Sequence, residues 1–214
     1  MNQLRKLPVL IFMLMSFMFL HCNSPEEPST LVLNSLNRTP VITGIYVTAV
    51  DPSSVTGYTQ RGQLGNPSYL QNQTSVIACP NPYNIFDVSI GQLPVPRIAL
   101  YNLPPVSELQ IYKGIYGFDL TGQKLLNVGN VQTIEGAVFI NAPSEPIRTI
   151  EHTSGSGDEV WNLFDDNGSL VPSGFYRIFI IPVTKNANSI QWVDIYLITD
   201  KKWKDPTGWL SSSQ

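Results

Sequence analysis

The chain has 214 residues, 43% of them hydrophobic, and its 13 basic and 16 acidic residues give a formal charge of −3. A chain of that sign has no general attraction to nucleic acid or to an anionic membrane leaflet. Only two cysteines are present, so no disulfide framework holds the fold together. The length is sufficient for one sizeable hydrophobic core, or for one domain with an accessory piece.

Residues 1–21 have the layout of a secretory signal. Arg5 and Lys6 precede an apolar run over residues 7–20 that ends at His21-Cys22. As a helix, this run would span roughly 21 Å, which is less than the roughly 30 Å hydrocarbon core of a bilayer. A cleaved signal is therefore favoured over a permanent spanning helix. Its removal leaves 11 basic and 16 acidic residues, a formal charge of −5.

The end of the signal, Phe19-Leu20-His21-Cys22, resembles the lipobox of bacterial lipoproteins. The resemblance implies lipidation of Cys22 and cleavage before it, so that a covalent lipid anchors the protein in the cell envelope, at the outer membrane or the cell surface. Residues 22–40 then form a tether, which begins polar, acidic and broken by proline. Two alternatives remain, an uncleaved signal anchor and an ordinary secreted protein in which Cys22 pairs with Cys79.

Beyond the tether, short alternating apolar runs between turn residues predict an all-β chain. The expected strands cover residues 41–50, 97–103, 108–112, 136–140, 147–152, 175–181 and 190–199. In the last strand, Val193, Ile195 and Leu197 face a core, whereas Trp192, Asp194 and Tyr196 are assigned to a wetter face. Residues 41–78 are predicted to hold accessory strands and a long exposed loop from 56 to 73, which is rich in Gly, Gln and Asn.

From Cys79 onward, the order of motifs resembles the immunoglobulin-like domain of the flagellar hook-assembly scaffold protein and of type IX secretion sorting domains. The matching segments are Pro80-Asn81-Pro82-Tyr83-Asn84, Ile98-Ala99-Leu100-Tyr101-Asn102-Leu103-Pro104, Pro146-Ile147-Arg148-Thr149-Ile150, Glu159-Val160-Trp161-Asn162-Leu163, Asp166-Asn167-Gly168 and Val171-Pro172-Ser173-Gly174-Phe175-Tyr176. The resemblance implies an immunoglobulin-like (fibronectin III-like) antiparallel β-sandwich over residues 79–199. An insertion over about residues 106–135 departs from the pattern and is expected to add a hairpin. Residues 200–214 form a C-terminal tail.

Catalytic and metal chemistry find little support in the sequence. A zinc site or a thiol nucleophile would have to combine Cys79 with His152, with no local spacing in favour. Asp158, Glu159 and the pair Asp165-Asp166 allow a carboxylate pair or a calcium site, but contiguous Asp-Asp-Asn-Gly is more typical of a turn. We therefore expect no enzyme, no metal and no cofactor.

Aromatic side chains offer another route to function, because exposed rings stack on sugars or anchor partner proteins. Trp203 and Trp209 in the tail and Tyr116 in the insertion are the candidate contacts for a partner or a glycan. The tail alternatively folds back over the end of the sandwich.

The leading prediction is a non-enzymatic, membrane-anchored lipoprotein that serves as a structural or protein-binding module of the envelope or of an extracellular assembly. Its partners would be the membrane, through the lipid, and an unidentified envelope or surface protein, with no nucleic acid. The alternatives are a carbohydrate-binding surface lipoprotein, a substrate of a type IX-like secretion system, and a hydrolase using the acidic stretch.

Overall fold

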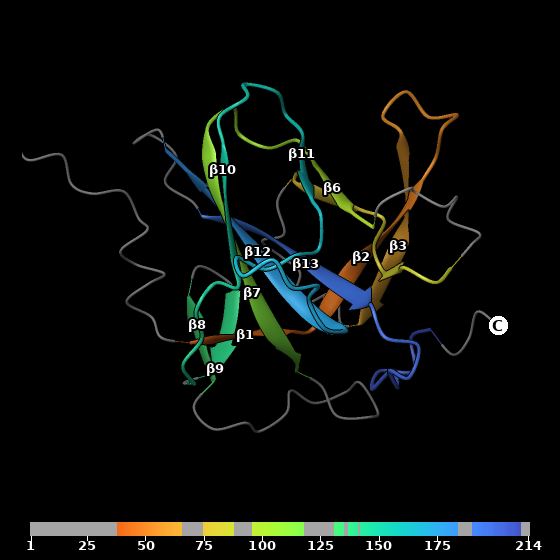
Figure 1. Ribbon diagram of the computed structural model, residues 1–214, viewed down its shortest axis with the longest axis vertical. Coiled ribbons are helices and arrows are strands. Elements are labelled where there is room, and N and C mark those ends of the chain that lie inside the picture. The colour runs from red at the N-terminus through yellow and green to blue at the C-terminus, as the bar shows by residue number, and fades with distance from the viewer. Residues whose placement is uncertain are drawn as a thin grey trace, which may run out of the picture.

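The computed structural model describes residues 38–65, 75–87, 96–117, 131–134, 137–140, 142–183 and 190–210 (Figure 1). These ranges contain thirteen strands and no helix. The strands are β1 (Thr39–Ile42), β2 (Gly44–Val50), β3 (Tyr58–Gly65), β4 (Ile77–Cys79), β5 (Tyr83–Asn84), β6 (Ile98–Tyr101), β7 (Ser107–Tyr116), β8 (Val131–Ile134), β9 (Ala137–Ile140), β10 (Arg148–His152), β11 (Glu159–Trp161), β12 (Gly174–Pro182) and β13 (Gln191–Ile198). The prediction of an all-β chain is confirmed for this part of the protein. Cys22 and residues 1–37 lie outside the described ranges.

No helix among the described residues has the length and apolar character needed to cross a membrane.

The strands form one large sheet, one small sheet and a ribbon. The large sheet has the order β5-β13-β12-β7-β1-β9-β8, and β10 shares with β1 one edge of β7. The small sheet has the order β11-β6-β4, and the ribbon consists of β2 and β3. Most pairs are antiparallel, but β1 pairs with β7 and β5 pairs with β13 in parallel. The expectation of an antiparallel sandwich therefore does not hold for the β1–β7 pair and the β5–β13 pair.

The main core lies between the large and the small sheet. Alternate residues of β12 and β13 supply one side of it, including Ile178 and Ile195, which are both fully buried. The small sheet supplies Leu100 of β6 and Trp161 of β11 from the other side. Burial of such side chains stabilises a fold by roughly 1.5–3 kcal/mol each, so this aliphatic layer is the dominant stabilising feature.

The other face of the large sheet is buried as well, which corrects the expectation of a wetter face. Trp192, Asp194 and Tyr196 are all nearly inaccessible. Phe139 of β9 packs beside Trp192, and Ile42 and the ribbon pack over Tyr196. An alternating polar and apolar strand is typical of a half-exposed sheet, but here accessory strands cover the second face.

A buried ion pair lies in the middle of this second face. Arg177 of β12 and Asp194 of β13 are directly opposed in the register, and their side chains are 4% and 2% exposed. The guanidinium Nε donates to Oδ1 at 2.7 Å and Nη2 donates to Oδ2 at 2.8 Å. Nη2 also donates to the Val41 carbonyl at 3.2 Å, and the guanidinium carbon lies 5.5 Å from the Trp192 ring centroid. The Arg177 side chain thus links β1 to the β12–β13 pair.

A corner precedes β12 where the chain returns from the small sheet to the large one. The Tyr176 hydroxyl donates to the Pro172 carbonyl, and the Trp161 ring packs against the Tyr176 ring with centroids 5.7 Å apart. The preceding turn is closed by Asp165, whose Oδ1 accepts from the amides of Asn167 and Ser169 at 2.9 and 2.8 Å. Gly168 has a φ of 77°, which explains why glycine stands there.

The accessory region differs from the prediction in two ways. The expected strand over residues 41–50 is two strands, β1 and β2, separated at Thr43. Residues Tyr58–Gly65 of the expected loop form β3, which is paired with β2 along its length. Its Gly and Gln content suggested a loop, but backbone pairing in the ribbon overrides weak strand propensity. Residues 66–74 of that loop lie outside the described ranges.

Residues Ser107–Tyr116, which fall in the expected insertion, form one long strand of the large sheet, β7. Leu109 and Ile111, which were assigned to the insertion at residues 106–135, lie fully buried in β7 between β12 and β10. The accessory hairpin is β8–β9, and it joins the large sheet through β1. Alternation of apolar and polar residues alone does not show whether a strand lies inside a sheet, like β7, or at its edge, like β8, because both kinds of strand bury one face.

Candidate functional site

Two chain connections and the residue after β12 meet at one end of the sandwich, which we call the loop end. They are residues 102–106 between β6 and β7, residues 153–158 between β10 and β11, and Val183. The Leu103 amide donates to the Gly157 carbonyl at 2.8 Å, and the Val183 amide donates to the Val106 carbonyl at 3.2 Å. The two connections lie at the same end of the molecule in Figure 1.

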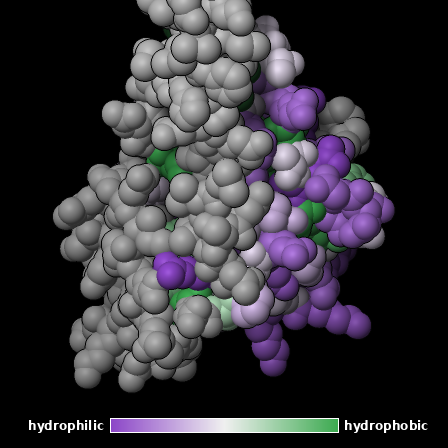
Figure 2. Space-filling model, turned by 90° about the vertical axis from the view of Figure 1, so that its left-hand side faces the viewer, coloured by the Kyte–Doolittle hydropathy of each residue, from purple (hydrophilic) through white to green (hydrophobic). Residues whose placement is uncertain are grey.

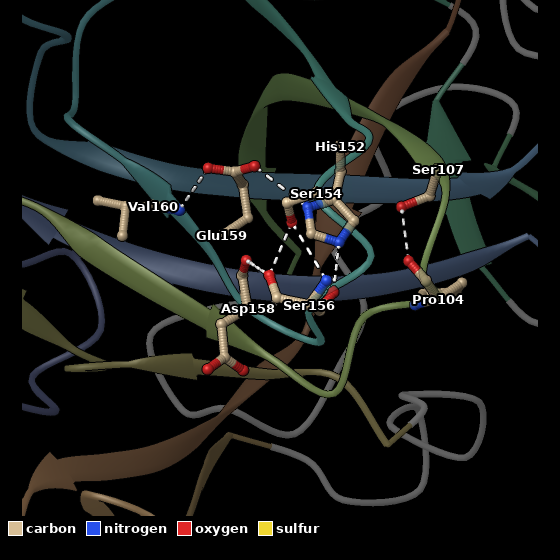
Figure 3. Close-up of polar contacts among 8 residues, drawn as sticks. All are labelled: Pro104, Ser107, His152, Ser154, Ser156, Asp158, Glu159 and Val160. Carbon is tan, nitrogen blue, oxygen red and sulfur yellow. Dashed lines mark hydrogen bonds and ion pairs between the residues drawn. The ribbon is translucent and has the colours of Figure 1, made fainter.

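His152 is the buried centre of the loop end (Figure 3). It ends β10 opposite Ser107 of β7. Its Nδ1 lies 3.1 Å from Glu159 Oε2, and its Nε2 lies 2.8 Å from the Ser156 carbonyl oxygen. Because a carbonyl oxygen only accepts, Nε2 carries a proton. Both ring nitrogens are therefore engaged, and His152 ties β10, β11 and their connection together.

The connection above His152 is internally hydrogen-bonded. The Ser154 and Ser156 hydroxyl oxygens lie 2.7 Å apart, and the Ser156 hydroxyl donates to the Asp158 carbonyl at 3.0 Å. Residues 153–158 are nevertheless exposed. Beside them, Val106 is 38% and Val183 is 52% exposed. The result is a fixed surface of Ser and Gly with two exposed valines.

Figure 2 shows one side of the molecule, where the described residues in view are mostly hydrophilic, with hydrophobic residues visible between them. Single exposed apolar residues such as Val106 and Val183 are common in proteins.

The three aromatic residues predicted from sequence come together at the opposite end, around Tyr196. The Trp203 indole N–H donates to the Tyr196 hydroxyl at 3.1 Å. Trp209 makes edge contacts with Tyr116, centroids 5.2 Å apart, and with Phe175 at 5.9 Å. Trp203 remains 37% exposed, whereas Tyr116 and Trp209 are half-buried. The tail thus folds back over the sandwich, as one of the two alternatives anticipated.

Asp205 holds the tail in this position. It accepts from the Tyr196 hydroxyl at 2.8 Å, from the Thr207 hydroxyl at 2.6 Å and from the Leu210 amide at 2.9 Å. Burial alone would raise the pKa of Asp205, but these hydrogen bonds to the charged form lower it below its ordinary value. The tail is therefore fixed by an ionised carboxylate.

Cys79 and His152 are not brought together. Cys79 ends β4 in the small sheet, whereas His152 belongs to the large sheet and uses both nitrogens elsewhere. Burial raises the pKa of the Cys79 thiol to about 11, despite a hydrogen bond with Thr48 that acts in the opposite direction. A protonated thiol is a poor nucleophile and a poor metal ligand.

The acidic stretch is dispersed among structural roles. Asp166 pairs with Arg148 at 3.0 Å and accepts from the Thr149 amide at 3.3 Å. Glu159 contacts His152, and Asp165 closes its own turn. Among the described residues, no group of three or more His, Cys, Asp or Glu side chains is arranged to hold a metal ion.

Nothing in the sequence indicated that Val106 and Val183 lie beside His152, because the register that brings Ser107 opposite His152 is a long-range property. The Thr-Ser-Gly-Ser-Gly run after His152, which includes Ser156, was a local signal, and it indicated a loop without indicating its neighbours.

No protein-family model matches the chain, and no curated protein matches it either. A weak structural neighbour among solved structures is PorZ from Porphyromonas gingivalis, described as an essential bacterial surface component of the type IX secretion system. The two share 14% sequence identity with a TM-score of 0.34. The match covers 68% of this chain and 14% of PorZ, so the chain spans only a small part of that protein's length.

Proposed function

We propose that this protein is a non-enzymatic lipoprotein of the cell envelope, anchored through Cys22 at the outer membrane or cell surface, whose immunoglobulin-like sandwich binds another envelope or surface protein through the loop end. The observation that carries the proposal is the loop end itself. Two connections are fixed there by backbone hydrogen bonds and by buried His152, and Val106 and Val183 are exposed beside them.

The strand order supports an immunoglobulin-like type. One sheet of the sandwich is β4-β6-β11, and the other contains β5-β13-β12-β7-β10. In immunoglobulin-like domains, strands A, B and E pack in the same way on G, F and C, with an additional strand beside C in some types. The Tyr176 hydrogen bond to Pro172, just ahead of the strand that corresponds to F, matches the tyrosine corner of that fold.

Preorganisation supports the loop end as a binding surface. A loop that is already ordered loses less conformational entropy on binding, which improves affinity without new contacts. Ser and Gly supply adaptable hydrogen bonds in the binding loops of other sandwiches. Valines that emerge beside such loops add apolar area to the contact.

A pull-down tests the protein-binding role. Tagged full-length protein is crosslinked in native envelopes and compared with a double variant, Val106→Asp plus Val183→Asp. We expect a specific protein in the wild-type sample and its loss in the variant, because a buried unpaired carboxylate is costly at an interface. Val55→Asp, at the fully exposed tip of the ribbon, is the matched control and should retain the partner. Recovery of no specific protein, or equal loss in both variants, contradicts the proposal.

The anchor is tested separately by intact mass. Protein from the membrane fraction should carry the added mass of a diacylglycerol and an acyl chain on a chain that begins at Cys22, since stable anchoring takes more than one chain. Cys22→Ala should remove the added mass. An unmodified mass in the wild-type protein contradicts lipidation and reopens both a Cys22 to Cys79 disulfide and a freely secreted protein.

A further inference from the structure

The buried ring of His152 has an oxygen atom facing each of its two nitrogens (Figure 3). Nε2 lies 2.8 Å from the Ser156 carbonyl oxygen, and Nδ1 lies 3.1 Å from Glu159 Oε2. A carbonyl oxygen and an ionised carboxylate accept hydrogen bonds and do not donate them. A neutral histidine ring has a single N–H to donate, so it satisfies only one of these two contacts.

The hydroxyl groups near the ring are directed elsewhere. Ser107 lies opposite His152 in the register, and its hydroxyl donates to the Pro104 carbonyl at 3.5 Å. The hydroxyl oxygens of Ser154 and Ser156 lie 2.7 Å apart and bond to each other. None of these hydroxyls is therefore the partner of Nδ1, and a second proton shared between the ring and the carboxylate is needed to satisfy that contact.

The surroundings of Glu159 favour the ring as the place of the second proton. Its Oε1 accepts from the Val160 amide at 2.9 Å, and its side chain is 26% exposed, so the ionised carboxylate is both hydrogen-bonded and partly hydrated. A hydrogen bond between an imidazolium and a carboxylate is also stronger than one between neutral groups. The contacts therefore match a charged ring paired with a charged carboxylate.

Other charged groups near the ring are directed away from it. Glu151 precedes His152 on β10, and Glu108 is its partner on β7, so strand alternation places both acids on the opposite face of the sheet. The carboxylate of Asp158 points away from the ring in Figure 3. Residues 102–106 include no charged side chain. Among the described residues, the carboxylate that contacts Nδ1 is thus the charge that faces the ring.

From this geometry we propose that proton binding at His152 closes the loop end, which loosens when the proton is lost as the pH rises. On deprotonation, Nδ1 releases its proton to water and presents a lone pair to the Glu159 carboxylate, which leaves a buried acceptor without a donor. The connection 153–158 then keeps only one of its two flanking contacts with the ring. Because the closed loop binds one proton more than the open loop, acid favours closure. The proposal holds whatever molecule the loop end binds.

The test is an NMR titration of the full-length protein in a zwitterionic detergent, from about pH 5 to about pH 8, the interval in which histidine ordinarily changes charge. We expect the His152 ring to carry two N–H groups at the acidic end and Nε2–H alone at the other. The Leu103 amide reports on closure, because it donates to the Gly157 carbonyl at 2.8 Å. Its protection against hydrogen exchange, corrected for the intrinsic rate at each pH, should fall about tenfold as the ring loses its proton.

Two matched variants assign the effect to the contact with Nδ1. In Glu159→Gln, the side-chain amide can donate to Nδ1 of a neutral ring, so the ring should stay neutral and the protection of Leu103 should stay constant across the interval. Glu151→Gln makes the same change at an exposed acid on the other face and should keep the wild-type response.

Three results would overturn the proposal. The first is a wild-type ring of His152 that keeps one charge state across the whole interval. The second is protection of the Leu103 amide that does not follow the charge of the ring. The third is a wild-type response in Glu159→Gln.

Discussion

Different residues cover the two ends of β12. At its first residues, Phe175 lies under an aromatic cluster that the C-terminal tail covers with Trp209. At its last residues, Pro182 pairs with Ser107, which is opposite His152, and among the described residues the connections 102–106 and 153–158 lie at this end. Tyr116 and Trp209, which suggested binding from the sequence, are therefore half-buried, Trp203 remains partly exposed, and the loop end presents Ser, Gly and Val instead.

The largest effect on stability is expected from Asp194→Ala. This change removes one member of the ion pair that lies between the two ends of β12. It removes the carboxylate that accepts from the buried Arg177 guanidinium, so the free energy of unfolding should fall by about 3–5 kcal/mol. Urea unfolding of both proteins measures the difference. Asp166→Ala, which breaks the more exposed pair with Arg148, should cost only about 1 kcal/mol. Similar costs for the two variants would contradict the buried role of Arg177.

The tail end should respond next to Trp209→Ala. The change removes ring contacts with Tyr116, Phe175 and Tyr196, and for a half-buried tryptophan we expect a loss of about 2–3 kcal/mol. Hydrogen exchange should rise in residues 200–210 and stay unchanged in residues 153–158. Faster exchange at both ends would show that the two ends are not independent.

His152→Ala should affect the loop end and leave the tail end unchanged, the opposite of what is expected for Trp209→Ala. Loss of the two ring hydrogen bonds should cost about 1–3 kcal/mol and speed exchange in residues 153–158, while residues 200–210 remain protected. Ser154→Ala, in the exposed part of the same loop, should change stability by less than about 0.5 kcal/mol. If exchange in the loop is unaffected by His152→Ala, the histidine does not organise the loop end.

The smallest effect is expected from acid at the tail end. The pKa of Asp205 is lower in the folded protein than its ordinary value of 3.8, so its contribution is present above that value and is lost as the pH falls through the folded pKa. Tryptophan fluorescence should therefore report a local loosening at low pH before the main unfolding. In Asp205→Asn this early step should be absent. An identical acid profile for the variant would rule out Asp205 as the group responsible.

Local sequence patterns predicted many strands of the sandwich, but not the strands and tail that pack on the second face of the large sheet. The predicted strand at residues 190–199 corresponds closely to β13, because period-two alternation is a local signal. The same alternation placed Trp192, Asp194 and Tyr196 on a wet face, since a sequence does not show that β1, β9 and the tail lie over them. β3 was missed for a related reason, because its pairing with β2 outweighs its own weak propensity.

The candidate site shows the same division between local and long-range information. Turn chemistry at Asp165 is local and was predicted, and the structure has that turn. The two contacts of the His152 ring form because the chain after β10 turns back and brings Ser156 and Glu159 beside it. No rule of sequence spacing predicts this arrangement. Tyr116 and the tail tryptophans were selected by residue type, but residue type alone does not say whether a ring faces solvent or a core.

Site-specific photocrosslinking can locate the surface that binds another envelope protein. A photoreactive amino acid replaces Val106 at the loop end, Trp203 at the tail end or Val55 at the ribbon tip, and each protein is irradiated in native envelopes. We expect a discrete crosslinked protein from position 106, with little or none from positions 203 and 55. Crosslinks that arise mainly from position 203, or equally from all three positions, would contradict the loop end as the binding surface.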